Sequence, residues 1–121
     1  MLSVIPANLI RFIADDDGQP VVMLNLLRFQ PNGGRDRYRK YLDMAGPVVA
    51  RHGAEIVFAG EGLTALAAEP GQQWDAVVLV RYPSCQTMLE IFSDPDYAPA
   101  DEIRRSALTE AVLQPIQTMA S

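Results

Sequence analysis

Two arginines lie near the ends of two apolar stretches of the sequence and could bind an anion. Residues 21–29 read VVMLNLLRF and contain Arg28, and residues 74–82 read WDAVVLVRY and contain Arg81. A predicted helix follows each stretch, and both guanidinium groups and helix N-termini favour negative charge. This pattern predicts a pocket for a carboxylate, an enolate or a phosphate, lined by Arg28, Phe29, Arg81, Tyr82 and Ser84.

Three further polar side chains could line this pocket. Asn25 lies inside the first apolar stretch, where a buried amide without partners costs about 1 to 3 kcal/mol. Either a ligand or the neighbouring backbone must therefore satisfy it. Tyr38 and Tyr41 lie one turn apart on the apolar stripe of the next predicted helix, where each buried hydroxyl needs a partner. All three are candidate binding residues.

Each candidate also has an ordinary structural explanation. Strand-end arginines often extend into solvent or pair with surface acids such as Asp36 and Asp94, and buried polar groups usually find backbone partners. His52 suits a helix C-terminus, although fold analogy also allows a haem ligand or a general base. Cys85 has no second cysteine and suits a structural role. The sequence shows no nucleophile and base with an orienting third group, so it predicts no particular reaction.

Composition excludes several classes of partner. The chain has 121 residues, 49% of them hydrophobic, which suits one domain over residues 1–121. A net charge of −5 argues against nucleic acid. One cysteine and one histidine cannot form a Cys/His zinc site or an internal disulfide, so a reducing compartment is expected. We also expect no bound metal and no cofactor. No apolar run approaches the roughly 18 residues of a membrane span, so a cytoplasmic protein is expected.

Hydrophobic periodicity and breaker residues predict the secondary structure. We expect helices at about residues 6–14, 36–53 and 84–92, with Ser84 as an N-cap, and a helical stretch over 93–113 that begins at Asp94 and Pro95. Pro47 should kink or break the second helix. Strands are expected at 21–29, 54–68, 74–82 and 113–119, and Pro115 confines the last one to a sheet edge.

This order of elements favours a split βαβ arrangement. Strands 21–29 and 74–82 should lie side by side at the centre of the sheet, and we expect them to run parallel. Both would then end at the same edge, which brings Arg28 and Arg81 together. The helices would cover one face of the sheet.

Both central strands are apolar on both faces. Val22, Leu24 and Leu26 alternate with Val21, Met23 and Leu27, and strand 74–82 follows the same pattern. Helices from one chain cover only one face, and the other would expose a large apolar patch. A homodimer with sheet packed against sheet is therefore expected.

These segments also resemble a known family. The motifs GQPVVMLNLLRF, HGAEIVFAGEG, WDAVVLVRYPS and FSDPDYAPADEIRRSAL, with Tyr38 and Tyr41, are similar to the DUF1330 family of the dimeric α+β barrel superfamily over about residues 18–113. The resemblance implies an α+β fold: a ferredoxin-like split βαβ sandwich whose antiparallel four-stranded sheet has helices on one face and pairs with that of a partner.

The resemblance implies no single reaction. Many members of that family carry Glu where this chain has Arg81 and Trp near Ile91, so a role borrowed through position 81 does not transfer. Relatives in the superfamily include cofactor-free monooxygenases, lactone isomerases and haem enzymes. The expectation is a homodimer that binds a small apolar or aromatic anion, with cofactor-independent proton transfer or oxygenation as an extension. The alternative is a non-catalytic ligand-binding or stress-associated module.

Overall fold

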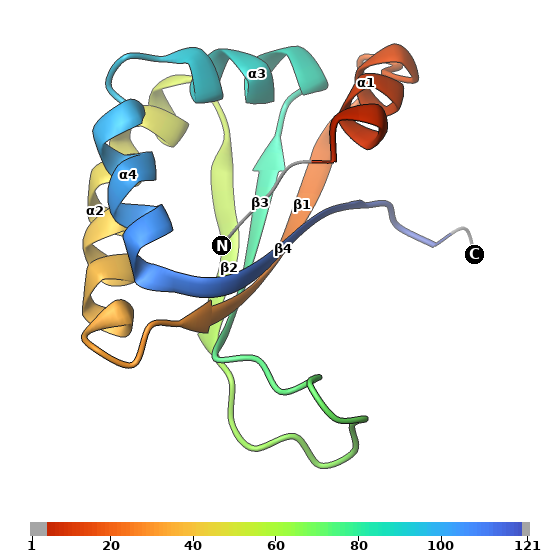
Figure 1. Ribbon diagram of the computed structural model, residues 1–121. Helices are drawn as coiled ribbons and strands as arrows, with labels where there is room; N and C mark the ends of the chain where they lie inside the picture. The colour runs from red at the N-terminus through yellow and green to blue at the C-terminus, as the bar shows by residue number, and fades with distance from the viewer. Residues whose placement is uncertain (1–4, 120–121) are drawn as a thin grey trace.

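The computed structural model describes residues 5–119, so the ends of the predicted 1–121 domain lie outside the described residues. Its elements are α1 (Pro6–Ala14), β1 (Val21–Phe29), α2 (Gly34–Arg51), β2 (Glu55–Glu61), β3 (Ala76–Tyr82), α3 (Cys85–Ser93), α4 (Ala98–Ala107) and β4 (Leu108–Ile116) (Figure 1). The fold is α+β and ferredoxin-like, as predicted.

The four strands form one sheet in the order β2-β3-β1-β4, and every neighbouring pair is antiparallel. The predicted central positions of β1 and β3 are confirmed, but the prediction that they run parallel is wrong. Val22 pairs with Arg81, and Leu27 pairs with Ala76. The helical crossover through α2 makes β1 and β2 the parallel pair, and β3 fits between them in the opposite direction. Their C-terminal ends therefore lie at opposite edges.

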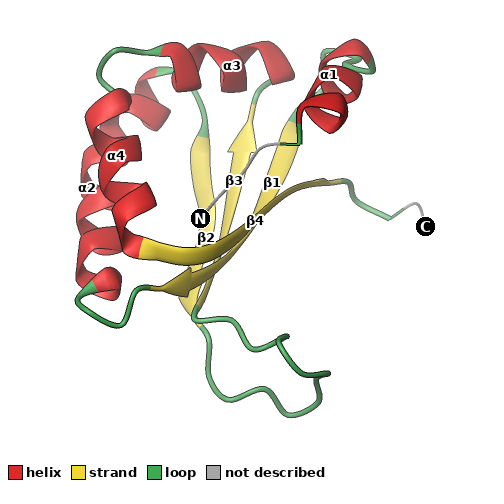
Figure 2. Cartoon of the chain, in the orientation of Figure 1, coloured by secondary structure: helices red, strands yellow, loops and turns green. Residues whose placement is uncertain are grey.

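Helices α2, α3 and α4 pack on one face of the sheet (Figure 2). Met23, Asn25 and Leu27 of β1 point toward them and are buried, as are Ala76 and Val78 of β3. Within α3, Ser84 accepts a hydrogen bond from the Thr87 amide at 3.1 Å, which confirms the predicted N-cap. The buried side chains of α3 are Cys85, Met88 and Ile91.

Element boundaries differ from the prediction at three places. Helix α2 continues through Pro47 without a break. Helix α4 begins at Ala98, whereas Asp94 ends α3 and accepts a hydrogen bond from the Asp96 amide. Strand β4 begins at Leu108, five residues before the predicted start at 113, because it pairs with almost the whole length of β1. Helical spacing through Ala111 could not indicate this long-range pairing.

The second face of the sheet is apolar and carries none of the helices found within residues 5–119. Its central residues are half-exposed: Val22, Leu24, Leu26, Val77, Leu79 and Val112. Phe58 and Ile116 lie toward its margins and are 55% and 40% exposed. We call these eight residues the open face. The prediction that the central strands are apolar on both sides is confirmed.

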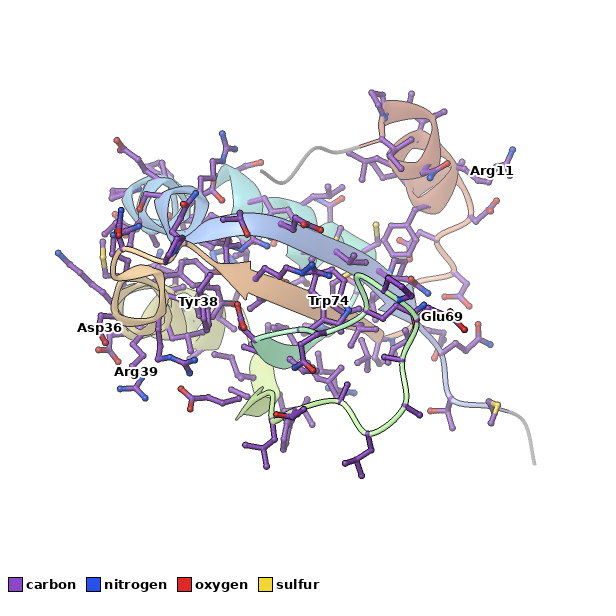
Figure 3. All side chains as sticks on the ribbon, turned by 60° about the horizontal axis from the view of Figure 1, so that its bottom comes forward. Arg11, Asp36, Tyr38, Arg39, Glu69 and Trp74 are labelled. Carbon is purple, nitrogen blue, oxygen red and sulfur yellow. The ribbon has the colours of Figure 1, made fainter. Side chains whose placement is uncertain are left out.

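A long loop over residues 62–75 joins β2 to β3 and extends away from the sheet (Figure 1). Leu63 and Leu66 near its start are almost fully exposed. At its end the Asp75 carboxylate accepts a hydrogen bond from the Phe29 amide at 2.8 Å, and Trp74 lies where the loop returns to the sheet (Figure 3). The predicted strand over 54–68 therefore stops at Glu61. Among residues 5–119, no helix combines the length and apolar character needed to cross a membrane.

Candidate functional site

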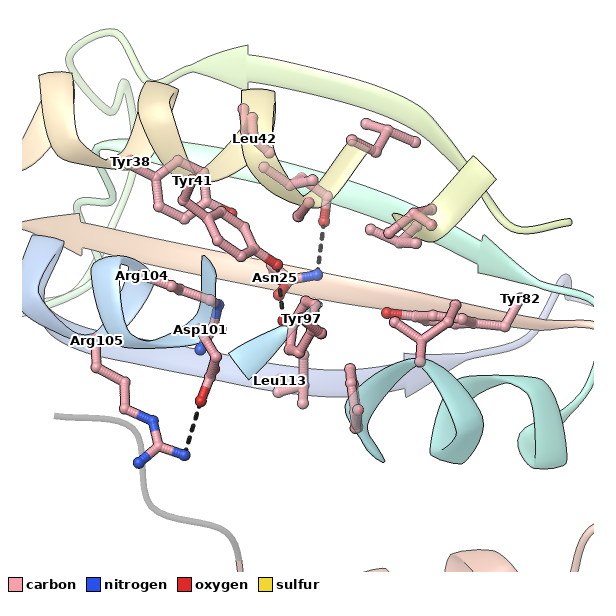
Figure 4. Close-up of a pocket in the computed structure, with 17 residues that line it drawn as sticks. Asn25, Tyr38, Tyr41, Leu42, Tyr82, Tyr97, Asp101, Arg104, Arg105 and Leu113 are labelled. Atoms are coloured by element: carbon pink, nitrogen blue, oxygen red, sulfur yellow. Dashed lines mark hydrogen bonds and ion pairs between the residues drawn. The ribbon is translucent and has the colours of Figure 1, made fainter. Parts of the chain in front are cut away.

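A cavity of about 200 Å³ lies between the sheet and the helices. Asn25 enters it from β1, Tyr38 and Tyr41 from α2, Tyr82 from β3 and Tyr97 from the N-cap of α4 (Figure 4). Apolar side chains of β2, β3 and β4 and of α2 and α3 complete the wall, among them Val80, Leu113 and Ile91. Polar groups in an otherwise apolar cavity are the usual composition of a small-molecule site.

All four tyrosines of the chain line this cavity. The ring centres of Tyr38 and Tyr41 are 5.2 Å apart, and the hydroxyls of Tyr41 and Tyr97 are hydrogen-bonded at 2.9 Å. Burial raises the pKa of all four hydroxyls above the ordinary tyrosine value, and the Tyr41 neighbour adds to the rise at Tyr38, Tyr82 and Tyr97. The hydroxyls are therefore neutral at physiological pH, which makes them hydrogen-bond donors and poor bases.

Arg104 is the one positive charge that is buried in the cavity wall among residues 5–119, and only 4% of it is exposed. Its guanidinium interacts with the Tyr38 hydroxyl. No carboxylate among residues 5–119 forms a salt bridge with it, because Asp101 one turn earlier pairs with Arg105 at 2.8 Å. A buried charge without a counter-ion is expensive. Arg104 therefore presents an unneutralised cation to the cavity.

Asn25 is 7% exposed and only partly satisfied by the protein. Its Nδ2 donates to the backbone carbonyls of Met23 and Val78 at 3.4 and 3.3 Å. Its Oδ1 accepts no hydrogen bond from the residues that the structure describes. The backbone explanation for Asn25 therefore holds for its nitrogen, whereas its oxygen has no hydrogen-bond donor among residues 5–119.

Of the seven predicted binding residues, the structure brings four together in the cavity and leaves three outside. Asn25, Tyr38, Tyr41 and Tyr82 line it. The predicted meeting of Arg28 and Arg81 at one sheet edge is wrong, because Arg81 pairs with Val22, six residues before Arg28 on an antiparallel strand. The two arginines are therefore about 20 Å apart along the sheet, at a rise of about 3.3 Å per residue.

The three residues outside the cavity have structural roles or face solvent. Arg28 stacks over Trp74 with its Cζ 4.3 Å from the ring centre, donates to the Gly71 carbonyl and pairs with Glu110 at 3.5 Å. It therefore fastens the 62–75 loop to the sheet. Arg81 is exposed, and Ser84 caps α3.

The sequence reasoning missed two buried residues of the cavity with polar groups, namely Tyr97 and Arg104. A signal for both was present in the spacing. Tyr97, Ala100, Arg104 and Ala107 follow one another at intervals of three or four residues, and all four are buried. A charged residue on the apolar stripe of a helix is the pattern that could have identified Arg104.

His52 lies outside the cavity lining and belongs to an ionic cluster at the end of α2. Its Nε2 is 2.9 Å from Asp94 Oδ2, and Arg51 reaches the same oxygen at 2.5 Å. Three hydrogen bonds hold the pKa of Asp94 well below its usual range. They come, in order of size, from the His52 ring, the backbone amide of Asp96 and the Arg51 guanidinium. This arrangement assigns His52 a structural role and offers no support for a haem ligand.

Asp94→Asn is expected to lower the thermal midpoint by a few degrees at neutral pH, because the variant loses the charged acceptor. A depressed folded-state pKa stabilises the protein above the unfolded-state pKa of about 4, and this stabilisation declines as the pH falls toward the folded value. The difference between wild type and variant should therefore narrow below roughly pH 4. Thermal unfolding followed by circular dichroism at neutral and acidic pH measures it, and a pH-independent difference would contradict the linkage.

No group of three or more His, Cys, Asp or Glu side chains that could hold a metal ion occurs among residues 5–119. Burial raises the pKa of the Cys85 thiol, which disfavours the reactive thiolate. The polar groups of the cavity lining that are not paired with each other in the Asp101–Arg105 salt bridge are Arg104, the tyrosine hydroxyls and Asn25.

This fold defines the chain as a ferredoxin-like α+β protein with its cavity between sheet and helices. Residues 33–114 match the family described as "Domain of unknown function (DUF1330)". The match covers more than half of the sequence, so the chain belongs to the DUF1330 family, as the motifs indicated. No curated protein is significantly similar to it in sequence.

Solved structures share the fold. The RPA0582 protein of unknown function from Rhodopseudomonas palustris is 28% identical with a TM-score of 0.87, over 98% of this chain and 97% of that chain. A dimeric ferredoxin-like protein of unknown function from Jannaschia sp. CCS1 is 10% identical with a TM-score of 0.63, over 82% and 99%. SnoaB, a cofactor-independent oxygenase from Streptomyces nogalater, is 13% identical with a TM-score of 0.60, over 85% and 96%. The last two likenesses concern the fold alone.

Proposed function

We propose that the cavity binds a small apolar or aromatic monoanion. The observation that carries this proposal is Arg104, a guanidinium that is 4% exposed and pairs with no carboxylate of residues 5–119. A ligand carboxylate would supply the missing counter-charge and accept hydrogen bonds from the guanidinium and a tyrosine hydroxyl. The volume also suits such a ligand, because a dry cavity of about 150 Å³ can hold benzene. A cavity of about 200 Å³ accommodates one ring with an acidic substituent.

Calorimetric titration of the wild-type protein tests this function with pairs of acids and neutral isosteres. Benzoate and benzamide have nearly the same size and shape, but only benzoate carries a charge. We expect benzoate to bind at least about tenfold more tightly, because the buried guanidinium is left without a counter-ion in the benzamide complex. Equal affinities for the two ligands, or no binding of either, would refute the proposal.

Binding without turnover is the function that the geometry favours. Asp101 is the only carboxylate in the cavity lining among residues 5–119, and Arg105 engages it. The raised pKa values keep the tyrosine hydroxyls protonated, so these groups cannot take up a proton as general bases. This arrangement suits a ligand-binding or stress-associated module.

Cofactor-independent proton transfer or oxygenation is the second candidate. Arg104 and the hydroxyl donors could stabilise an enolate or another oxyanion as charge develops on a bound substrate. SnoaB shows that the fold can host cofactor-independent oxygenation, but fold analogy does not transfer the activity.

We also propose a cytoplasmic homodimer. The open face supports the dimer, because it presents valine and leucine side chains from β1, β3 and β4 that no helix of the described residues covers. The dimeric description of the protein from Jannaschia agrees with this arrangement. A two-fold axis would place the open faces of two copies against each other. The single cysteine supports a reducing compartment.

A further inference from the structure

The amide of Asn25 has a defined orientation, although oxygen and nitrogen are not distinguished by shape. One end of the amide faces the carbonyl oxygens of Met23 and Val78, at 3.4 and 3.3 Å. Carbonyl oxygens only accept hydrogen bonds, so the atom that faces them must be the nitrogen. The other atom, Oδ1, is therefore an acceptor.

Oδ1 of Asn25 is an acceptor that the described part of the chain leaves unused. No donor of residues 5–119 reaches it, and it is not among the polar atoms sealed inside the protein. Asn25 lines the cavity beside the hydroxyl pair of Tyr41 and Tyr97 (Figure 4). An unpartnered acceptor in the wall of a ligand cavity favours a ligand that donates a hydrogen bond to it.

The donors of the cavity are different groups. Each hydroxyl of Tyr41 and Tyr97 has one proton, and the bond between them at 2.9 Å uses only one of the two. The second proton remains available to an acceptor on the ligand, as do donors of Arg104. The cavity thus offers a charged group of donors at Arg104 and the tyrosine pair, together with a neutral acceptor at Asn25.

We propose that the ligand of this cavity is a hydroxylated acid, in which the carboxylate pairs with Arg104 and the hydroxyl donates to Asn25 Oδ1. The inference rests on the proposed function and adds to it a second recognition element. A ligand without the hydroxyl leaves the buried acceptor unpaired, which disfavours its binding. The ligand class is therefore a small hydroxy acid with one ring.

The test compares benzoate with meta- and para-hydroxybenzoate and with their methoxy counterparts, by calorimetry on the full chain. A methoxy group has an oxygen but no proton to donate. At least one hydroxybenzoate should bind about tenfold more tightly than benzoate, and its methoxy counterpart should show no gain. In Asn25→Leu the ratio of hydroxybenzoate to benzoate affinity should fall to about one. Asn8→Leu, which changes an exposed asparagine of α1, should keep the wild-type ratio.

Each outcome bears on one proposal or on both. If benzoate binds more tightly than benzamide but the hydroxyl adds nothing, the hydroxy acid is wrong and the anion site remains. If the acids bind no better than benzamide, both proposals fail. A hydroxyl preference that persists in Asn25→Leu overturns the role of Asn25. The ligand series in the wild-type protein decides the hydroxyl preference even if Asn25→Leu does not fold.

Discussion

Replacing Arg104 by methionine is expected to weaken the binding of small acids strongly while the protein remains folded. Truncating one member of a buried, hydrogen-bonded charge pair costs about 2 to 5 kcal/mol, which is at least about 30-fold in affinity. The dissociation constant for benzoate should therefore rise by this factor or more. Benzamide affinity should change far less, because a neutral ligand gains little from the guanidinium.

The same Arg104→Met substitution should not lower the stability of the protein, although it lowers the affinity for benzoate. Arg104 is buried with no carboxylate of residues 5–119 to neutralise it, so the folded protein bears the desolvation cost of the charge. Methionine has a similar unbranched shape and no charge. Replacing buried ionic groups by apolar side chains is often neutral or stabilising by about 1 to 4 kcal/mol. We expect the free energy of unfolding of Arg104→Met to equal or exceed that of wild type, as measured by urea denaturation.

The matched control is Arg11→Met. It removes the same charge from an exposed position on α1, well away from Tyr38 on α2 (Figure 3). Its benzoate affinity and its stability should match those of wild type. Unchanged benzoate binding in Arg104→Met, or an equal loss in Arg11→Met, would show that Arg104 is not the anion-binding group.

Replacing Leu24 by lysine is expected to convert the proposed dimer into monomers. Leu24 lies at the centre of the open face, paired with Leu79 of β3 on one side and with Gln114 of β4 on the other. Burying one leucine stabilises a dimer by about 1.5 to 3 kcal/mol. In a two-fold dimer both copies carry the substitution, so this energy is lost twice. The dissociation constant of the dimer should therefore rise by at least about 100-fold.

Analytical ultracentrifugation measures the change. At micromolar concentration the measured mass of wild type should be twice the 13.3 kDa of one chain. The measured mass of Leu24→Lys should be that of one chain. Leu66→Lys is the control, because it introduces the same charge at a fully exposed leucine of the 62–75 loop. A monomeric wild type, or a dimeric Leu24→Lys, would contradict sheet-to-sheet dimerisation.

Local sequence signals predicted most of the secondary structure. Ser84 marked the start of α3, and the continuous apolar runs marked β1 and β3 as central strands with two apolar faces. These features depend on propensity, capping and periodicity, which neighbouring residues determine. The end of α4 was misplaced because β4 begins where pairing with β1 becomes possible. Such pairing joins residues far apart in the sequence, from Phe29 with Leu108 to Val22 with Ile116.

In the candidate site, too, some features follow from the sequence and others only from the tertiary structure. The sequence by itself determined that the chain has an α+β fold with a sheet apolar on both sides, and that Asn25, Tyr38 and Tyr41 are polar groups in apolar surroundings. The tertiary structure decided which cation shares their cavity. Strand direction sets which residues meet at a sheet edge, and the antiparallel pairing of β1 and β3 separates Arg28 from Arg81. The packing of α4 against the sheet buries Arg104, so this residue and neither Arg28 nor Arg81 is the cation of the cavity. The sequence places Arg104 on the apolar side of a helix, but only the packed layers determine which residues lie opposite it.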